Sequence, residues 1–235
     1  RFMKLLASIV TALSLALPVY GQSAAEPVVV ELYTSQGCSS CPPADALLHE
    51  LAKRDDVLPL ALHVDYWDYI GWKDPFARPA HAKRQKGYAH AGGRRMIYTP
   101  QMIIMGQDDV VGTDAMEVAD AIERHTDQPR PVSLSVVRQG DELVIRLQPR
   151  VQMPDGKLVV QLVRYTPERT ISIKRGELAG RTFTYANVVE DWQIAAEWDG
   201  AGELEVSVPV SGSQPAAVLV QEAPFGRIIA AARAD

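Results

Sequence analysis

Residues 28–45 read VVVELYTSQGCSSCPPAD, and this stretch decides the fold that we expect for the first half of the chain. The unbroken apolar and β-branched run at residues 28–33 is typical of a buried β-strand. The two prolines at 42–43 suit the first turn of a helix, where a residue without an N–H group is tolerated. The sequence therefore predicts a strand, a turn and a helix, with a C-x-x-C pair at the helix start.

Cys38 and Cys41 are the only cysteines among the 235 residues. Free backbone N–H groups and the positive end of the helix dipole favour a thiolate at a helix start. The spacing also lets the second thiol resolve a mixed disulfide formed by the first. We therefore predict thiol–disulfide exchange, with Cys38 as nucleophile and Cys41 as resolving thiol. The intervening Ser39 and Ser40 leave the direction of electron flow open.

Two other uses of the cysteine pair stay open. A purely structural disulfide is one, although closing so short a loop would stabilise the fold weakly. A zinc or copper site is the other, but the sequence has no second C-x-x-C and no paired-His motif. We interpret the five scattered histidines as surface or satisfied core residues: His49, His63, His81, His90 and His125. We predict no metal and no cofactor.

The N-terminal residues have the pattern of an export signal. Arg1 and Lys4 precede an apolar stretch at residues 5–17, which small residues follow, so we expect a signal peptide over residues 1–25. The stretch is short for a transmembrane helix, and we predict no stable membrane insertion after cleavage. Export would place the cysteines in oxidising surroundings, so the predicted location is the periplasm or the medium.

The charge of the chain argues against nucleic acid as a partner. The formal net charge is −5, and it becomes −7 without residues 1–25, whereas nucleic-acid binding needs a basic face. The one basic cluster, at residues 83–86, is interpreted as a solvated helix face. We predict instead a protein or a small molecule that carries a thiol or a disulfide.

Alternating strand and helix signals predict an α/β first half. The expected elements after the first strand are a helix over Ala44–Lys53, a strand over Val57–Val64, a helix around Pro75–Ala89, strands over Gln101–Met105 and Asp109–Val111, and a helix through His125. This order corresponds to the minimum of a thioredoxin fold. We therefore predict a thioredoxin-like domain over residues 26–127.

Pro100 fits a feature of the thioredoxin superfamily, in which a cis-proline precedes the third core strand and faces the active-site sulfurs. We predict a cis bond between Thr99 and Pro100, although most X-Pro bonds are trans. The backbone before this proline would align an extended partner, so Tyr98 and Thr99 are predicted to bind substrate.

Glu31 lies near the place where thioredoxins keep a buried carboxylate behind the sulfurs, although the match needs one extra residue in the loop. We predict that it assists proton transfer, the alternative being a strand-end carboxylate in solvent. Trp67 and Trp72 belong to an aromatic-rich insertion at residues 66–76. This insertion either lines a substrate groove beside the thiols, as we predict for both tryptophans, or forms a small core that anchors a long loop.

Short alternating runs with turn signals replace the helical patterns after residue 128. The expected strands are Val132–Val137, Leu143–Leu147, Lys157–Tyr165, Ile171–Ile173, Arg181–Val189, Gln193–Glu197, Glu203–Val208, Ala217–Glu222 and Arg227–Ala231. We predict an all-β, immunoglobulin-like sandwich domain over residues 128–235. It lacks cysteines and a ligand cluster, so we assign it to packing or partner presentation.

The run E-L-Y-T-S-Q-G-C-S-S-C-P-P-A-D, with H-V-D-Y-W-D-Y-I-G-W-K-D-P-F and Y-T-P-Q downstream, resembles an uncharacterised family of exported bacterial thioredoxin-like proteins, classed as a domain of unknown function. The later R-G-E and T-Y-A-N-V-V segments extend the resemblance over nearly the whole mature chain. It implies the fold and export but no proven activity. The family's motif positions correspond here to Cys38, Cys41, Pro42, Pro43, Asp65, Trp67, Trp72, Tyr98, Thr99 and Pro100.

Two functions from different classes follow. The first is an exported thiol–disulfide oxidoreductase that acts through the C-x-x-C pair on protein or small-molecule thiols. The second is a non-catalytic thioredoxin-like binding module, with the cysteines as a switch or as copper or zinc ligands. A depressed pKa of the attacking thiol would favour the first.

Overall fold

The computed structural model describes residues 26–153 and 156–234, so the expected signal peptide lies outside the described residues. The first half contains β1 (Val28–Thr34), α1 (Pro42–Leu51), β2 (Val57–His63), the short 3-10 helix η1 (Asp68–Ile70), α2 (Pro79–Ala91), β3 (Gln101–Ile104), β4 (Asp108–Val111) and α3 (Ala115–Thr126). These elements agree with the predicted ones within a few residues at their ends. Asp114 caps α3, since its carboxylate accepts the N–H of Glu117 at 3.0 Å.

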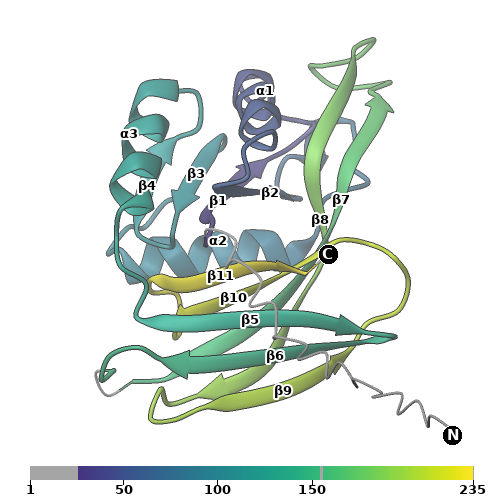
Figure 1. Ribbon diagram of the computed structural model, residues 1–235. Coiled ribbons are helices and arrows are strands. Elements are labelled where there is room, and N and C mark those ends of the chain that lie inside the picture. The colour runs from purple at the N-terminus through teal and green to yellow at the C-terminus, as the bar shows by residue number, and fades with distance from the viewer. Residues whose placement is uncertain (1–25, 154–155, 235) are drawn as a thin grey trace, which may run out of the picture.

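The second half is entirely β in the described residues. Its strands are β5 (Val132–Gln139), β6 (Glu142–Pro149), β7 (Leu158–Ser172), β8 (Thr182–Trp198), β9 (Leu204–Pro209), β10 (Ala216–Glu222) and β11 (Ile228–Ala234). Strands predicted separately at 157–165 and 171–173 are one strand, β7, and those at 181–189 and 193–197 are one strand, β8. These two long strands form a hairpin that reaches from the lower sheet up beside α1 (Figure 1).

The fold class predicted from the sequence is wrong. Most strands belong to one mixed eight-stranded sheet, in the order β11-β10-β7-β8-β2-β1-β3-β4, instead of a thioredoxin-like α/β domain followed by a separate β domain. The two halves join where β8 runs parallel to β2, through the pair Ala61 and Val188. Local patterns predict that a segment is a strand, but its pairing partner is decided by packing of distant segments. The domain boundary at residues 127/128 stays a prediction.

A β-sandwich is nevertheless present in the second half. The three-stranded sheet β5-β6-β9 packs on the β7, β10 and β11 part of the large sheet (Figure 1). The core between the two sheets contains Val132 and Ile145 from one side and Val160 and Val218 from the other. A second core contains residues of α1, α2, α3 and both halves of the large sheet, including Leu48, Ile122, Val163 and Leu219. The large sheet therefore contributes to both cores.

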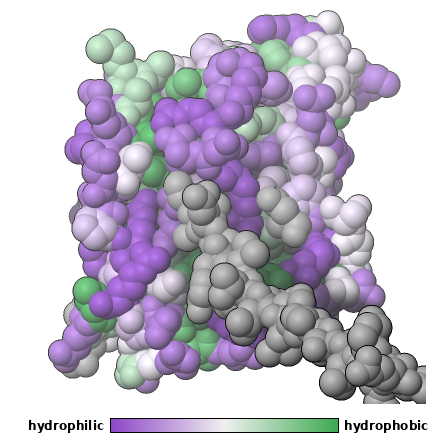
Figure 2. All heavy atoms as spheres, viewed as in Figure 1, coloured by the Kyte–Doolittle hydropathy of each residue, from purple (hydrophilic) through white to green (hydrophobic). Residues whose placement is uncertain are grey.

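The face of the molecule in Figure 2 is mostly polar. Figure 2 shows hydrophilic residues over most of the viewed face, with hydrophobic ones in small separate areas. Within the described residues, no helix has the length and apolar character needed to cross a membrane.

Candidate functional site

The C-x-x-C pair lies in a tight turn between β1 and α1. The Cys38 N–H donates to the Ser35 carbonyl at 3.1 Å, and the Cys41 N–H donates to the Cys38 carbonyl at 3.2 Å. These bonds bring the two Cα atoms to 5.4 Å, and the two sulfurs form a disulfide. The predicted disulfide of the C-x-x-C pair, between a strand and a helix, is confirmed.

The start of α1 provides fewer N–H groups than we expected. Pro42 and Pro43 occupy its first positions and have no N–H group, while the N–H groups of Ala44 and Asp45 donate to the Cys41 carbonyl at 2.9 and 3.1 Å. A thiolate in this turn would therefore depend on the helix dipole and on hydroxyl groups. The hydroxyl of Ser40 lies 3.4 Å from the Cys38 sulfur.

Both cysteines are buried in the disulfide form. Cys38 is 2% exposed and Cys41 is 0% exposed, whereas Ser39 and Ser40 between them are exposed. Attack on a disulfide requires access of the incoming thiolate to a sulfur atom. The turn must therefore open locally before a partner reaches Cys38.

The aromatic insertion braces this turn from one side. A Cβ on Gly37 would lie 2.9 Å from the Trp67 Cβ, so the two segments are in close contact. The Trp72 Nε1–H donates to the Gln36 Oε1 at 2.7 Å. Tyr69 stacks on Trp67 with ring centroids 6.3 Å apart, and it is 79% exposed. The two tryptophans thus hold the turn, and Tyr69 is the aromatic residue that remains open to a partner.

The predicted cis bond between Thr99 and Pro100 is confirmed. The Thr99 Oγ1 accepts the Trp67 Nε1–H at 2.8 Å, which connects this segment to the aromatic insertion that packs against the cysteine turn. A Cβ on Gly112 would lie 3.2 Å from the Pro100 Cβ and 3.1 Å from the Ala44 Cβ, so Pro100 packs near the first turn of α1. Tyr98 points elsewhere, since its hydroxyl donates to Asp109 at 2.8 Å.

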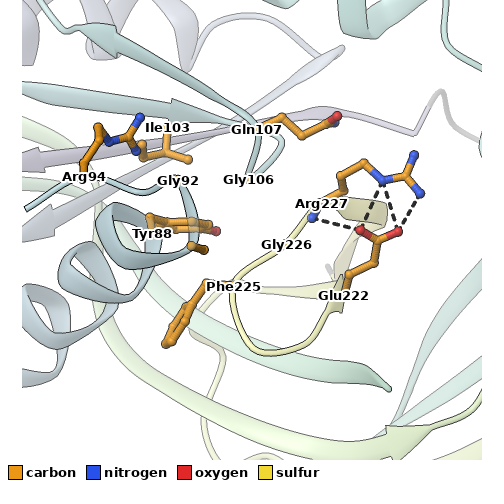
Figure 3. Close-up of a pocket in the computed structure, with 11 residues that line it drawn as sticks. Tyr88, Gly92, Arg94, Ile103, Gly106, Gln107, Glu222, Phe225, Gly226 and Arg227 are labelled. Carbon is orange, nitrogen blue, oxygen red and sulfur yellow. Dashed lines mark hydrogen bonds and ion pairs between the residues drawn. The ribbon is translucent and has the colours of Figure 1, made fainter. Parts of the chain in front are cut away.

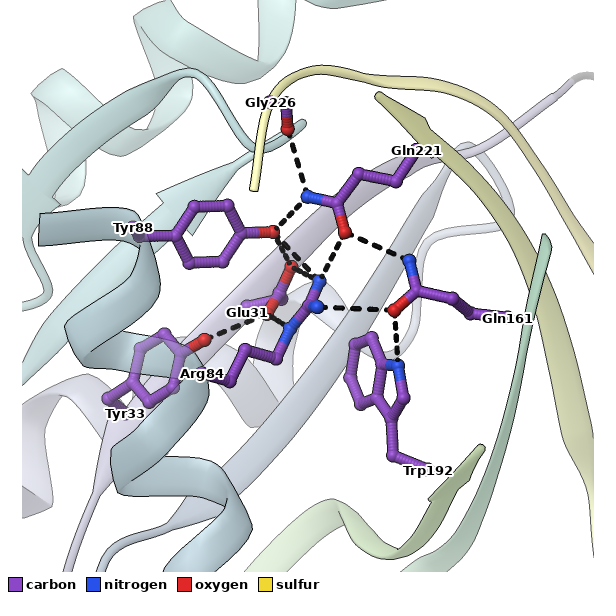
Figure 4. A network of polar contacts seen from close by, with 8 residues as sticks. All are labelled: Glu31, Tyr33, Arg84, Tyr88, Gln161, Trp192, Gln221 and Gly226. Carbon is purple, nitrogen blue, oxygen red and sulfur yellow. Dashed lines mark hydrogen bonds and ion pairs between the residues drawn. The ribbon is translucent and has the colours of Figure 1, made fainter. Parts of the chain in front are cut away.

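Glu31 lies in a different polar cluster. Neighbouring strand residues point to opposite faces, so Glu31 and Tyr33 share the face of α2, while Thr34 contacts α1. The Arg84 guanidinium donates to both Glu31 oxygens, at 2.7 and 2.9 Å (Figure 4). The Tyr33 hydroxyl donates to the Glu31 Oε2 at 2.9 Å, and the Tyr88 hydroxyl donates to the Oε1 at 2.7 Å. Nothing in this arrangement brings the Glu31 carboxylate to the sulfurs.

The basic cluster at residues 83–86 is only partly the solvated face that we predicted. Lys83 and Lys86 are exposed, but Arg84 and Gln85 are buried. Arg84 also contacts Gln161 and Gln221 of the second half, at 3.3 and 3.1 Å. Both glutamines lie at β-bulges, which change the direction of side chains within a strand.

A second buried cluster, which we call the Asp45 cluster, lies on the α1 side of the sheet. Its members are Asp45, His63, Asp74, Thr34 and Gln36. The Thr34 hydroxyl donates to the Asp45 Oδ1 at 2.7 Å, and the His63 Nδ1–H donates to the Asp74 Oδ2 at 2.7 Å. The Gln36 N–H donates to the same Asp74 oxygen at 2.9 Å, two residues before Cys38.

The sequence contained one usable signal for the Asp45 cluster. Asp45 follows Cys41 by four residues, the spacing that places two side chains on one helix face. Burial raises the pKa of Asp45 to about 7, against the lowering effects of His63 and the Thr34 hydroxyl. Burial also acts to raise the pKa of Asp74, but His63 and two backbone N–H groups hold it below its ordinary value.

A separate pocket of about 260 Å³ lies between α2, the β3–β4 turn and the loop before β11 (Figure 3). Tyr88, Arg94, Phe225 and Arg227 contribute to its wall, and the Arg227 guanidinium pairs with Glu222 at 2.5 Å. None of the site residues predicted from the sequence lines it. Among the described residues, no group of three or more His, Cys, Asp or Glu side chains is arranged to hold a metal ion.

Solved structures resemble this chain. A crystal structure of a protein from Agrobacterium tumefaciens matches with a TM-score of 0.77 and 35% identity, covering 91% of this chain and 96% of that chain. HBP35 of Porphyromonas gingivalis matches with a TM-score of 0.59 and 13% identity, over 90% of this chain and 75% of that chain, a likeness of fold alone. No curated protein matches. The family model described as "Protein of unknown function (DUF1223)" matches residues 29–221.

Proposed function

The chain belongs to the DUF1223 family, whose function is unknown, and from its disulfide we propose that it is an exported thiol–disulfide oxidoreductase. It acts through Cys38 and Cys41 on protein or small-molecule thiols. The observation that carries the proposal is the disulfide in a strand-to-helix turn. An oxidising compartment, such as the periplasm, suits this bond.

The exchange step needs only the disulfide and a partner with two thiols. The partner thiolate attacks the Cys38 sulfur, the S–S bond breaks, and its electron pair leaves on the Cys41 sulfur. The second partner thiolate then attacks the partner sulfur of the mixed disulfide and releases Cys38 as a thiolate. The partner becomes a disulfide, and the cysteine pair becomes two thiols after taking up two protons.

Residues around the turn are assigned supporting roles in this proposal. Trp67 and Trp72 hold the turn, and the backbone of Thr99 and Pro100 aligns the partner beside α1. Tyr69 supplies an exposed aromatic surface for the partner chain. Glu31 is left out of the chemistry because Arg84 and two tyrosines already occupy its oxygens.

A single-turnover experiment tests the proposed function. The oxidised mature protein is mixed with a peptide that contains two cysteines, and mass spectrometry follows both molecules. We expect the peptide to lose two hydrogens while the protein gains two, much faster than peptide oxidation by glutathione disulfide alone. Cys38→Ser should abolish the reaction. Cys41→Ser, first activated as a mixed disulfide with a small thiol at Cys38, should exchange onto a peptide with a single cysteine and hold it, because no second thiol is present to release it.

Burial of both sulfurs favours a second candidate, a binding module in which the disulfide is a switch. The same experiment separates the two. Peptide oxidation no faster than in Cys38→Ser, at every glutathione ratio tested, would reject the oxidoreductase. A change in binding of a protein partner upon reduction would then support the switch.

Ser40 is expected to assist Cys38. Its hydroxyl lies 3.4 Å from the Cys38 sulfur and can donate a hydrogen bond to a thiolate there. Ser40→Ala should therefore raise the pKa of the Cys38 thiol in the reduced protein and slow its alkylation by iodoacetamide near pH 7 severalfold. Ser39→Ala is the matched control, because it removes an equally exposed hydroxyl from the same dipeptide. Equal alkylation rates in the two variants would contradict this role.

A further inference from the structure

Asp45 is the buried acid that is connected to the cysteine pair through the backbone. Its N–H donates to the Cys41 carbonyl at 3.1 Å, one helical turn away. Residues four apart share a helix face, with Cβ atoms about 5–6 Å apart. Asp45 and Cys41 are both buried, so little water separates their side chains. A charge on the Asp45 carboxylate therefore acts on the Cys41 sulfur with little screening.

The Asp45 carboxyl has incomplete hydrogen bonding. Its Oδ1 accepts the Thr34 hydroxyl, but its buried Oδ2 has no hydrogen-bond partner among the described residues. The Nε2 of His63 and the Nε2 of Gln36, in the same cluster, are likewise buried and unpartnered. Unpaired buried polar atoms are costly to stability, so this cluster is a candidate for a role other than stability.

The strands β1, β2 and β8 pack against α1, and β2 and β8 place ionisable groups around Asp45. His63 on β2 favours the ionised form of Asp45, whereas the nearby Asp74 favours its neutral form. Tyr185 on β8 also faces this region, since burial and the nearby Asp45 and Asp74 raise its pKa. From β1, Thr34 supplies a hydroxyl and no charge.

The remaining ionisable neighbour on α1 is directed elsewhere. His49 follows Asp45 by one turn, and its ring lies 3.7 Å from the Glu168 carboxylate on β7. Burial brings the pKa of Asp45 to about 7, so this carboxyl changes charge in the physiological range.

We propose that Asp45 is a positioning residue that acts through Cys41: its charge state controls how readily Cys41 leaves as a thiolate when Cys38 is attacked. This inference rests on the proposed function. When the S–S bond breaks, the electron pair moves to the Cys41 sulfur. A neutral Asp45 leaves this developing charge unopposed, whereas an ionised Asp45 repels it. The ionised carboxylate thus raises the pKa of Cys41, and a thiol of higher pKa leaves more slowly. At a fixed concentration of attacking thiolate, the disulfide is therefore broken faster below pH 7 than above it.

Reduction of the oxidised mature protein by dithiothreitol tests the inference. Second-order rate constants are measured by quenched alkylation and mass spectrometry from pH 5.5 to 8.5. They are then divided by the thiolate fraction of the reagent. We expect the wild-type constant to fall about three- to tenfold as pH rises through 7. The rate constant of Asp45→Asn should not change with pH and should stay near the low-pH value of the wild type.

Two further variants separate charge from structure. Glu50→Gln removes an exposed carboxylate from the same helix, and it should keep the wild-type pH profile. Thr34→Val removes the hydrogen bond that favours ionised Asp45, so the midpoint of the fall should move to higher pH. A loss of packing alone would change the rates at all pH values without moving the midpoint.

The outcomes are decisive for Asp45. The inference would be overturned if the rate constant of Asp45→Asn fell through pH 7 as much as that of the wild type. It would also be overturned if the pH at the midpoint of the fall were the same in Thr34→Val as in the wild type. If Asp45→Asn does not fold, the Thr34→Val midpoint decides alone. If the protein fails to oxidise the peptide dithiol but keeps the pH-dependent reduction by dithiothreitol, the oxidoreductase is rejected and the effect of Asp45 on Cys41 stands.

Discussion

Replacement of Arg84 by Met is expected to lower the free energy of unfolding by about 3–5 kcal/mol. Arg84 donates to both oxygens of Glu31, which is 0% exposed. Without the guanidinium, the carboxylate keeps two tyrosine hydroxyls but has no positive charge beside it. Met retains an apolar stem against Trp192, whose ring lies 3.9 Å from the guanidinium carbon, so the loss reports mainly the buried charge. Urea unfolding followed by circular dichroism measures it.

The double variant Glu31→Gln with Arg84→Met is the control. Replacement of both members of a buried ion pair by neutral groups is often close to neutral in stability. The double variant should therefore recover most of the loss seen in Arg84→Met. A loss below about 1 kcal/mol in Arg84→Met would mean that the guanidinium in Figure 4 does not compensate a buried charge on Glu31.

Gly106→Ala should be the second most damaging change, with an expected loss of about 2–4 kcal/mol. Gly106 lies in the β3–β4 turn with φ of +69°, a conformation that Ala adopts at a cost. A Cβ there would also lie 2.4 Å from the Gly226 carbonyl oxygen, a backbone atom that a side-chain rotation does not displace. The neighbouring bond from the Ile228 N–H to the Met105 carbonyl, at 2.8 Å, would be disturbed as well.

Gly140→Ala separates the two causes. Gly140 has φ of +61°, and nothing lies within 4 Å of its Cβ position. This control should lose only about 1 kcal/mol, the cost of the left-handed conformation. The difference between the two variants in urea unfolding then measures the contact between the β3–β4 turn and the loop before β11. Equal losses would show that this contact is not tight.

Local signals predicted the elements of the first half, and the likeness to the thioredoxin superfamily predicted the cis-proline, but neither predicted the fold. The apolar run at 28–33 and the helical stripe after Pro42 are patterns within one segment, so they were readable. The joining of β2 to β8 depends on segments distant in sequence, for which one chain carries no pattern. Pro167 and the polar residues around it separate the two apolar runs of β7, at 157–165 and 171–173, which explains why one strand was predicted as two.

The site was predicted only in part for a similar reason. The cysteines and Pro100 are recognisable by spacing, and the structure places them at one end of α1. Arg84 was assigned to the surface because its basic neighbours are exposed, while its burial comes from β7, β8 and β10 of the second half. Asp45 carried a readable signal, its four-residue spacing from Cys41, whereas Glu31 looked like the buried acid because it lies on the strand before the motif.

The position of β2 between β1 and β8 has a consequence for the biogenesis of the protein. The ribosome makes β2 long before β8, and until then one edge of β2 presents unpaired N–H and C=O groups. Such an edge pairs readily with other chains and promotes aggregation. The long β7–β8 hairpin thus covers this edge of β2 only after β8 has been synthesised. We therefore expect the first half to stay open to such pairing until the later strands are synthesised.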